Sequence, residues 1–100
     1  MLDALLKAKW NGMKTALSEG DVEDSLVFIA KHKKELYEYN LQLMSSQMSE
    51  ISATMTYINL IQVTDGVVEY GMWTEYEGQT CNFLVRFIRD KDRIWRIEFF

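Results

Sequence analysis

The chain holds one histidine and one cysteine, the side chains that most often serve as a base or a nucleophile near neutral pH. His32 stands between lysines, which cannot orient an imidazole ring as a carboxylate would. Cys81 has no histidine in its own strand-like segment to activate the thiol. We therefore interpret His32 as a solvated residue at a helix C-terminus and Cys81 as a small, buried or half-buried filler.

Carboxylates gather at two places. Asp21, Glu23 and Asp24 stand where a helix is expected to begin, and capping together with the helix dipole accounts for them. A calcium loop would need oxygen ligands at alternating positions over about twelve residues, but the sequence soon becomes apolar. Asp90 and Asp92 are interpreted as the solvated tip of a hairpin. The sequence predicts no metal site, no cofactor and no catalytic set.

The basic run Lys31–Lys34 is the one feature that could meet phosphate. The chain has 11 basic and 15 acidic residues and a net charge of −4, whereas a nucleic-acid binder needs a net basic face. The i,i+4 spacings of Lys31–Glu35 and Lys34–Glu38 predict a salt-bridged helical face instead. No nucleic-acid partner is expected.

Aromatic residues and methionines form the richest set of candidate binding residues. Pockets are lined by apolar and aromatic groups with a few polar tips, and tyrosine supplies both. Most of this set is expected to be ordinary core, because a stripe at helical spacing usually packs inside. The candidate pocket lining is Trp10, Tyr37, Tyr57, Tyr70, Met72 and Trp73.

The first half of the sequence has the pattern of helices. Leu2, Leu6, Trp10, Met13 and Leu17 recur at spacings of three or four, which is typical of one buried helical stripe. Three helices are predicted, over residues 2–19, 21–31 and 33–52. A glycine inside the first helix, at position 12, costs about 1 kcal/mol relative to alanine, so a close packing neighbour is expected there.

The second half of the sequence has the pattern of strands, because apolar residues there recur at every second position. Four strands are predicted, over residues 55–64, 67–77, 80–89 and 94–100. Asp65-Gly66 favours a tight hairpin turn between the first two. Because all three links are short, the strands should form an antiparallel meander. The expected fold is a single α+β domain over residues 1–100, with three N-terminal helices packed on a curved four-stranded sheet.

Each strand also places large apolar residues on the face that the helices leave open. Such a surplus indicates a partner, and we expect a homodimer formed through the sheet face, or a bound ligand. No apolar run approaches the about 18–20 residues that span a bilayer, so a soluble protein is expected. The start of the chain shows no signal peptide, and its end inside the apolar stretch Ile97–Phe100 hints at a domain cut from a longer protein.

Two segments carry a resemblance to a known superfamily. The stretch Ala16–Leu26, which contains Gly20-Asp21, resembles the "helix, Gly-Asp, helix" opening of NTF2-like (cystatin-like α+β cone) domains. The stretch Phe87–Ile97, with its charged turn before Trp95, resembles their closing hairpin. The resemblance implies a curved sheet wrapped around a long helix with a conical pocket. It also implies a bacterial accessory module, either cytoplasmic or exported.

NTF2-like domains include isomerases and dehydratases as well as non-catalytic binding, transport and dimerisation modules. This chain is short for the fold and lacks a recognisable acid/base set. The sequence therefore favours a non-catalytic binding and dimerisation module that holds a small apolar ligand or peptide between helix and sheet. The alternative is a small isomerase- or dehydratase-type enzyme. It would pair a pocket carboxylate, Glu69 or Glu98, with a tyrosine, Tyr57 or Tyr70.

Overall fold

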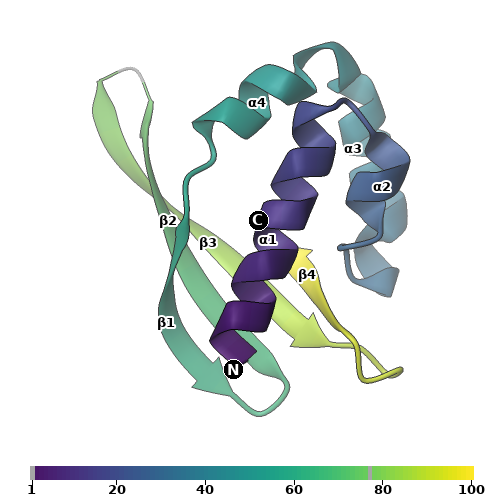
Figure 1. The fold of residues 1–100 in the computed structure, drawn as a ribbon, viewed down its shortest axis with the longest axis vertical. Coiled ribbons are helices and arrows are strands. Elements are labelled where there is room, and N and C mark those ends of the chain that lie inside the picture. Colours follow the sequence, from purple (N-terminus) through teal and green to yellow (C-terminus); the bar gives the residue numbers. More distant parts are fainter. Residues whose placement is uncertain (1, 77) are drawn as a thin grey trace.

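A computed structural model of the chain describes residues 2–76 and 78–100. It confirms an α+β architecture in two layers, with the helices on one face of a four-stranded antiparallel sheet (Figure 1). The helices are α1 (Leu2–Ser18), α2 (Val22–Leu26), the 3₁₀ turn η1 (Lys31–Lys33), α3 (Lys34–Leu43), the 3₁₀ turn η2 (Ser45–Gln47) and α4 (Met48–Thr54). The strands are β1 (Ile58–Thr64), β2 (Val67–Tyr76), β3 (Gln79–Arg89) and β4 (Trp95–Phe99).

Helix α1 lies across the sheet and buries the stripe that its spacing predicts, with Leu6, Trp10, Met13 and Leu17 all buried. The close neighbour expected at Gly12 is Phe28. A Cβ at position 12 would come within 2.7 Å of that ring. Glycine at this position lowers the intrinsic stability of the helix, but it allows α1 to contact the segment after α2 closely.

The second helix is shorter than expected. Asp21 caps it as predicted, since its Oδ1 accepts a hydrogen bond from the Asp24 N–H at 2.9 Å. The expectation of a helix to residue 31 is wrong, because α2 ends at Leu26 and the chain then runs beside β4. There Ile97 N–H donates to Phe28 C=O and Ala30 N–H donates to Ile97 C=O, at 2.7 and 2.8 Å. These sheet-type bonds replace those of another helical turn.

The third expected helix, over residues 33–52, is two helices rather than one. Helix α3 ends at Leu43, the chain tightens into η2, and α4 begins at Met48. Serine competes for backbone hydrogen bonds and weakens a helix interior, and Ser45 and Ser46 stand at this break. The break lets α4 turn back across the end of α1, where Met48 is buried.

The sheet is a meander in the order β1-β2-β3-β4, as expected. Gly66 has a φ of 75°, the left-handed conformation that the Asp-Gly turn requires. Strand β1 begins at Ile58 rather than at 55, because the preceding segment is held by side-chain hydrogen bonds with α1 and β2 and not by backbone pairing. Thr56 Oγ1 donates to Trp73 C=O at 2.6 Å, and Thr74 Oγ1 donates to Thr54 C=O at 2.7 Å. Trp10 Nε1 donates to Thr56 C=O at 3.0 Å. The expected end of the second strand at residue 77 lies outside the described residues.

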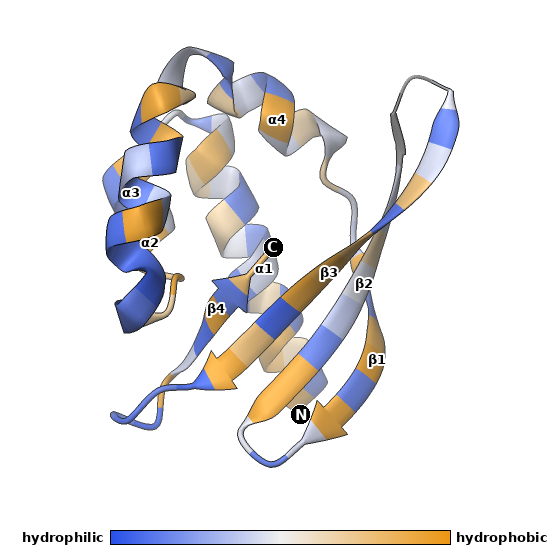
Figure 2. Ribbon diagram, turned by 180° about the vertical axis from the view of Figure 1, so that it is seen from behind, coloured by the Kyte–Doolittle hydropathy of each residue, from blue (hydrophilic) through white to orange (hydrophobic). Residues whose placement is uncertain are grey.

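One face of the sheet, which we call the inner face, packs against α1. Its buried residues are Ile58, Val68, Tyr70, Met72, Val85, Phe87 and Ile97. We call the opposite face the outer face. Apolar and hydrophilic residues alternate along stretches of the strands (Figure 2), as expected where successive side chains point to opposite faces of a sheet. None of the described helices has the length and apolar character needed to cross a membrane.

Candidate functional site

An apolar pocket opens between the helical layer and the C-terminal end of the chain. Its volume is about 340 Å³, at the small end of the range for ligand sites. Helices α1, α3 and α4 surround it, together with the last residue of the described chain. The lining residues are Leu17, Tyr37, Asn40, Leu41, Leu43, Met44, Ile51, Met55 and Phe100.

The pocket has a buried floor and an exposed rim. Leu17 and Leu41 are buried and form part of the hydrophobic core. Leu43 is 68% exposed and Met44 is 36% exposed, so these two residues stand at the entrance. Because methionine and leucine side chains are flexible, this rim can adapt to apolar groups of different shape.

The back wall is built by an aromatic contact between Tyr37 of α3 and Phe100. Their rings stack, and the Phe100 N–H donates to the Tyr37 hydroxyl at 3.3 Å. Burial raises the pKa of Tyr37 above its usual 10.0, so the phenol stays neutral near physiological pH. The Trp10 ring makes a T-shaped contact with the Phe100 ring from the core side.

The lining offers little acid–base chemistry. Apart from the Tyr37 hydroxyl, the only polar group among the described lining side chains is the amide of Asn40, and none of these side chains carries a charge near neutral pH. An apolar cavity with one amide and one phenol can hold an uncharged ligand and orient it by a hydrogen bond.

The six residues expected to line a pocket do not meet at this site. Only Tyr37 does so, while Tyr70 and Met72 are buried on the inner face and Trp73 lies on the outer face. Tyr57 is exposed. Together with the buried Trp10 it borders another, smaller cavity of about 120 Å³ between α1 and β1.

Sequence reasoning missed most of the lining as a site, although the signal was present. The spacings along Tyr37, Leu41, Met44, Ile51 and Met55 are three, four or seven residues, which is typical of one buried face of a continuous helix. The break at η2 folds this stripe into two walls that face each other across a gap. Phe100 closes the gap from the far end of the sequence.

The carboxylates considered for catalysis lie on the outer face, away from the pocket. Arg86 donates from Nε and Nη2 to Glu69 Oε2 at 3.1 Å, and from Nη1 to Glu98 Oε1 at 3.4 Å. These hydrogen bonds raise the pKa of the Arg86 guanidinium still further. His32 has a partner that sequence reasoning missed, because its Nε2 lies 3.0 Å from Glu98 Oε2.

Nor are the two candidate tyrosines beside those carboxylates. Tyr70 is buried on the inner face, and its hydroxyl donates to Asp3 Oδ1 at 2.7 Å. Burial, followed by this bond to an anion, raises the pKa of Tyr70. Tyr57 lies before β1, outside the sheet that carries Glu69 and Glu98. The geometry thus leaves the carboxylates paired with arginine and histidine.

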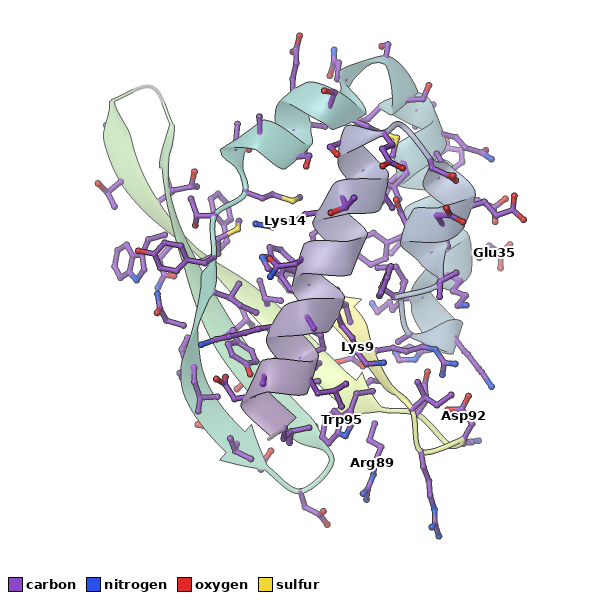
Figure 3. All side chains as sticks on the ribbon, viewed as in Figure 1. Lys9, Lys14, Glu35, Arg89, Asp92 and Trp95 are labelled. Carbon is purple, nitrogen blue, oxygen red and sulfur yellow. The ribbon has the colours of Figure 1, made fainter. Side chains whose placement is uncertain are left out.

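The hairpin between β3 and β4 is not a simple solvated tip, as the sequence interpretation had it. Arg96 Nη1 donates to Asp90 Oδ2 at 2.9 Å and to Asp92 Oδ1 at 3.0 Å, and the Arg96 and Asp90 side chains are largely buried. Lys31 Nζ lies 3.2 Å from Asp92 Oδ2, so the expected pairing of Lys31 with Glu35 is wrong. Figure 3 shows Asp92 at the β3–β4 turn and Glu35 on α3. No ion pair joins Lys34 to Glu38 in the part of the chain that the structure describes.

Cys81 carries a free thiol on β3 and is half-buried, as expected for a filler. Within residues 2–76 and 78–100, no three His, Cys, Asp or Glu side chains come together in a way that could hold a metal ion. The pocket is therefore the feature with the clearest capacity to bind.

No protein-family model matches this sequence, and a comparison with curated proteins finds no match. The assignment of a function thus depends on the geometry of the molecule itself.

Proposed function

We propose that this protein is a non-catalytic binding module whose α1/α3/α4 pocket holds a small, uncharged apolar ligand or an apolar peptide side chain. The observation that carries the proposal is the cavity of about 340 Å³, whose lining is apolar except for Asn40 and the Tyr37 hydroxyl. The NTF2-like resemblance implies a pocket between helix and sheet, whereas this pocket is surrounded by α1, α3 and α4, so the proposal depends on the cavity itself.

Binding can be tested with 1-octanol, an uncharged probe with an apolar chain and one hydroxyl. We expect saturable NMR shift changes at the methyl groups of Met44 and Met55, which line the pocket. Octanoate should bind more weakly, because burying a carboxylate without a cationic partner is costly. Shifts spread evenly over the surface would overturn the proposal.

A matched pair of substitutions makes this test specific. Ile51→Phe adds bulk to a half-buried pocket wall, and we expect it to weaken octanol binding about tenfold or more, a loss of about 1.4 kcal/mol. Ile94→Phe makes the same chemical change in the β3–β4 turn, away from the pocket, and should leave binding unchanged. Equal binding by both variants would contradict the assignment.

We also propose that the module self-associates through its sheet. On the outer face, Ile61 packs over Gly71 and Trp73 follows on β2, and both side chains are more than half exposed. Large exposed apolar side chains gathered on one surface commonly mark a protein interface. A molecular mass of twice 11.8 kDa in light scattering at high protein concentration is the expected result. A strict monomer would rule this second proposal out.

A further inference from the structure

The two edges of the sheet are different. At the β4 edge, Ile97 is hydrogen-bonded through both its N–H and its C=O to the Phe28–Ala30 segment, so this edge is already covered. At the other edge, β1 is paired with β2 alone within the described residues. One row of β1 N–H and C=O groups is thus left to pair with another strand (Figure 1).

Strand β1 lacks most of the devices that normally protect an open edge. Leu60, Ile61 and Val63 are 49%, 58% and 58% exposed. The sequence from Ile51 to Thr64 contains no charged residue and no proline, although these are the usual protection. A single register shift between Leu60 and Gln62 is the one irregularity in the strand.

We infer that two copies of this chain pair through their β1 strands, antiparallel, to form one continuous sheet across a two-fold axis. The inference rests on the proposed self-association and names the strand that performs it. Pairing centred on Ile61, the middle residue of β1, places Ile58 opposite Thr64 of the second copy. No like charges face each other in this arrangement, because the strand has none, so a neutral strand is the complementary partner for this edge.

The covered β4 edge explains why association should stop at two copies. An edge that pairs with its own symmetry copy forms an isologous interface, which closes as a dimer. A fibre would need a second open edge on each copy, and Phe28–Ala30 occupies it. The proposed assembly is therefore a dimer with an eight-stranded sheet.

Charge substitutions at position 61 test the pairing directly. Ile61→Lys alone and Ile61→Glu alone should each weaken the dimer about tenfold or more, because each places two like charges opposite one another. Mixing the two variants should restore a dimer, since lysine then faces glutamate. Light scattering over a concentration series and native mass spectrometry of the mixture provide the measurement.

Val27→Lys is the matched control. Val27 is 60% exposed and follows α2, so it loses a comparable apolar surface away from β1 and should leave the dimer intact. Circular dichroism checks that every variant folds. If the Ile61 variants unfold because Ile61 contacts the Gly71 site, the double variants Asn59→Lys/Val63→Lys and Asn59→Glu/Val63→Glu replace them, since this register places Val63 opposite Asn59 of the second copy.

The outcomes separate the proposals. A wild-type dimer that both single-charge variants lose and their mixture does not restore would overturn β1 pairing and leave self-association through the outer face, to which Ile61 also belongs. A dimer that persists in both single-charge variants would overturn both. A wild-type monomer at every concentration would overturn both, and would point to a strand from another protein as the occupant of this edge. Octanol binding is measured independently, so neither result decides the function of the pocket.

Discussion

The ring of Phe100 lies flat on the ring of Tyr37, with centroids 5.0 Å apart and an angle of 8° between the planes. The contact joins the last residue of the sheet-forming half to the middle of α3. It closes the back of the pocket and attaches α3 to the C-terminal strand.

Phe100→Ala should remove this wall. We expect the free energy of unfolding to fall by about 2 kcal/mol, less than the loss for a fully buried phenylalanine because Phe100 is half-buried. Chemical denaturation measures the change. Phe99→Ala is the control, since Phe99 is 47% exposed and should cost less than about 1 kcal/mol. Equal losses in the two variants would show that the stacked contact does not stabilise the fold.

Gly12→Ala tests the close approach of α1 to Phe28. Alanine favours a helix over glycine by about 1 kcal/mol, but its Cβ would lie 2.7 Å from the Phe28 ring. We expect the clash to prevail, with a net loss of about 1 kcal/mol in thermal unfolding experiments. In a Phe28→Leu background the same substitution should stabilise the protein. Stabilisation in the wild-type background would contradict the packing argument.

The buried hydroxyl of Tyr70 gives a pH-dependent prediction. Its hydrogen bond, followed by that from Lys7, holds the pKa of Asp3 below the usual 3.8. A carboxylate with a lowered pKa stabilises the folded state above 3.8, and this stabilisation is lost as the pH falls through the folded value. Tyr70→Phe should therefore lower the melting temperature near neutral pH, and the difference from wild type should shrink in strong acid. A constant difference at all pH values would refute the coupling.

Arg96→Met tests the ion cluster at the β3–β4 turn. Removal of the guanidinium leaves Asp90, which is 90% buried, without its cation, and we expect a loss of about 2 kcal/mol near neutral pH. Lys31→Met removes an exposed partner of Asp92 and should cost at most about 0.5 kcal/mol. Urea denaturation of both variants makes the comparison.

Acid should reduce the effect of Arg96→Met. The hydrogen bond from Arg96 is the main cause that holds the pKa of Asp92 far below 3.8, with smaller contributions from Ile94 N–H and Lys31. The stabilisation is therefore fully present above pH 3.8. It declines as the pH falls from 3.8 towards the lowered pKa of Asp92 in the folded protein. If the two proteins differed more in acid than at neutral pH, the assigned role of Arg96 would be wrong.

Local patterns in the sequence determined the element types and most of the boundaries. The stripe of α1, the Asp21 cap and the Asp65-Gly66 turn each depend on residues within a few positions of one another, and the structure confirms all three. The meander could also be predicted, because short links can join only neighbouring antiparallel strands.

Only the tertiary structure decided where α2 ends, where the long third helix breaks and which residues face the pocket. These features depend on contacts between segments far apart in the chain. The backbone of Ile97 hydrogen-bonds to the backbone of Phe28 and Ala30. Phe100 contacts Tyr37, which lies 63 positions earlier in the sequence. Helical periodicity marks a side chain as apolar but does not say whether a neighbour fills the space beside it. For that reason the stripe from Tyr37 to Met55 was readable in the sequence, whereas the pocket it lines required the fold.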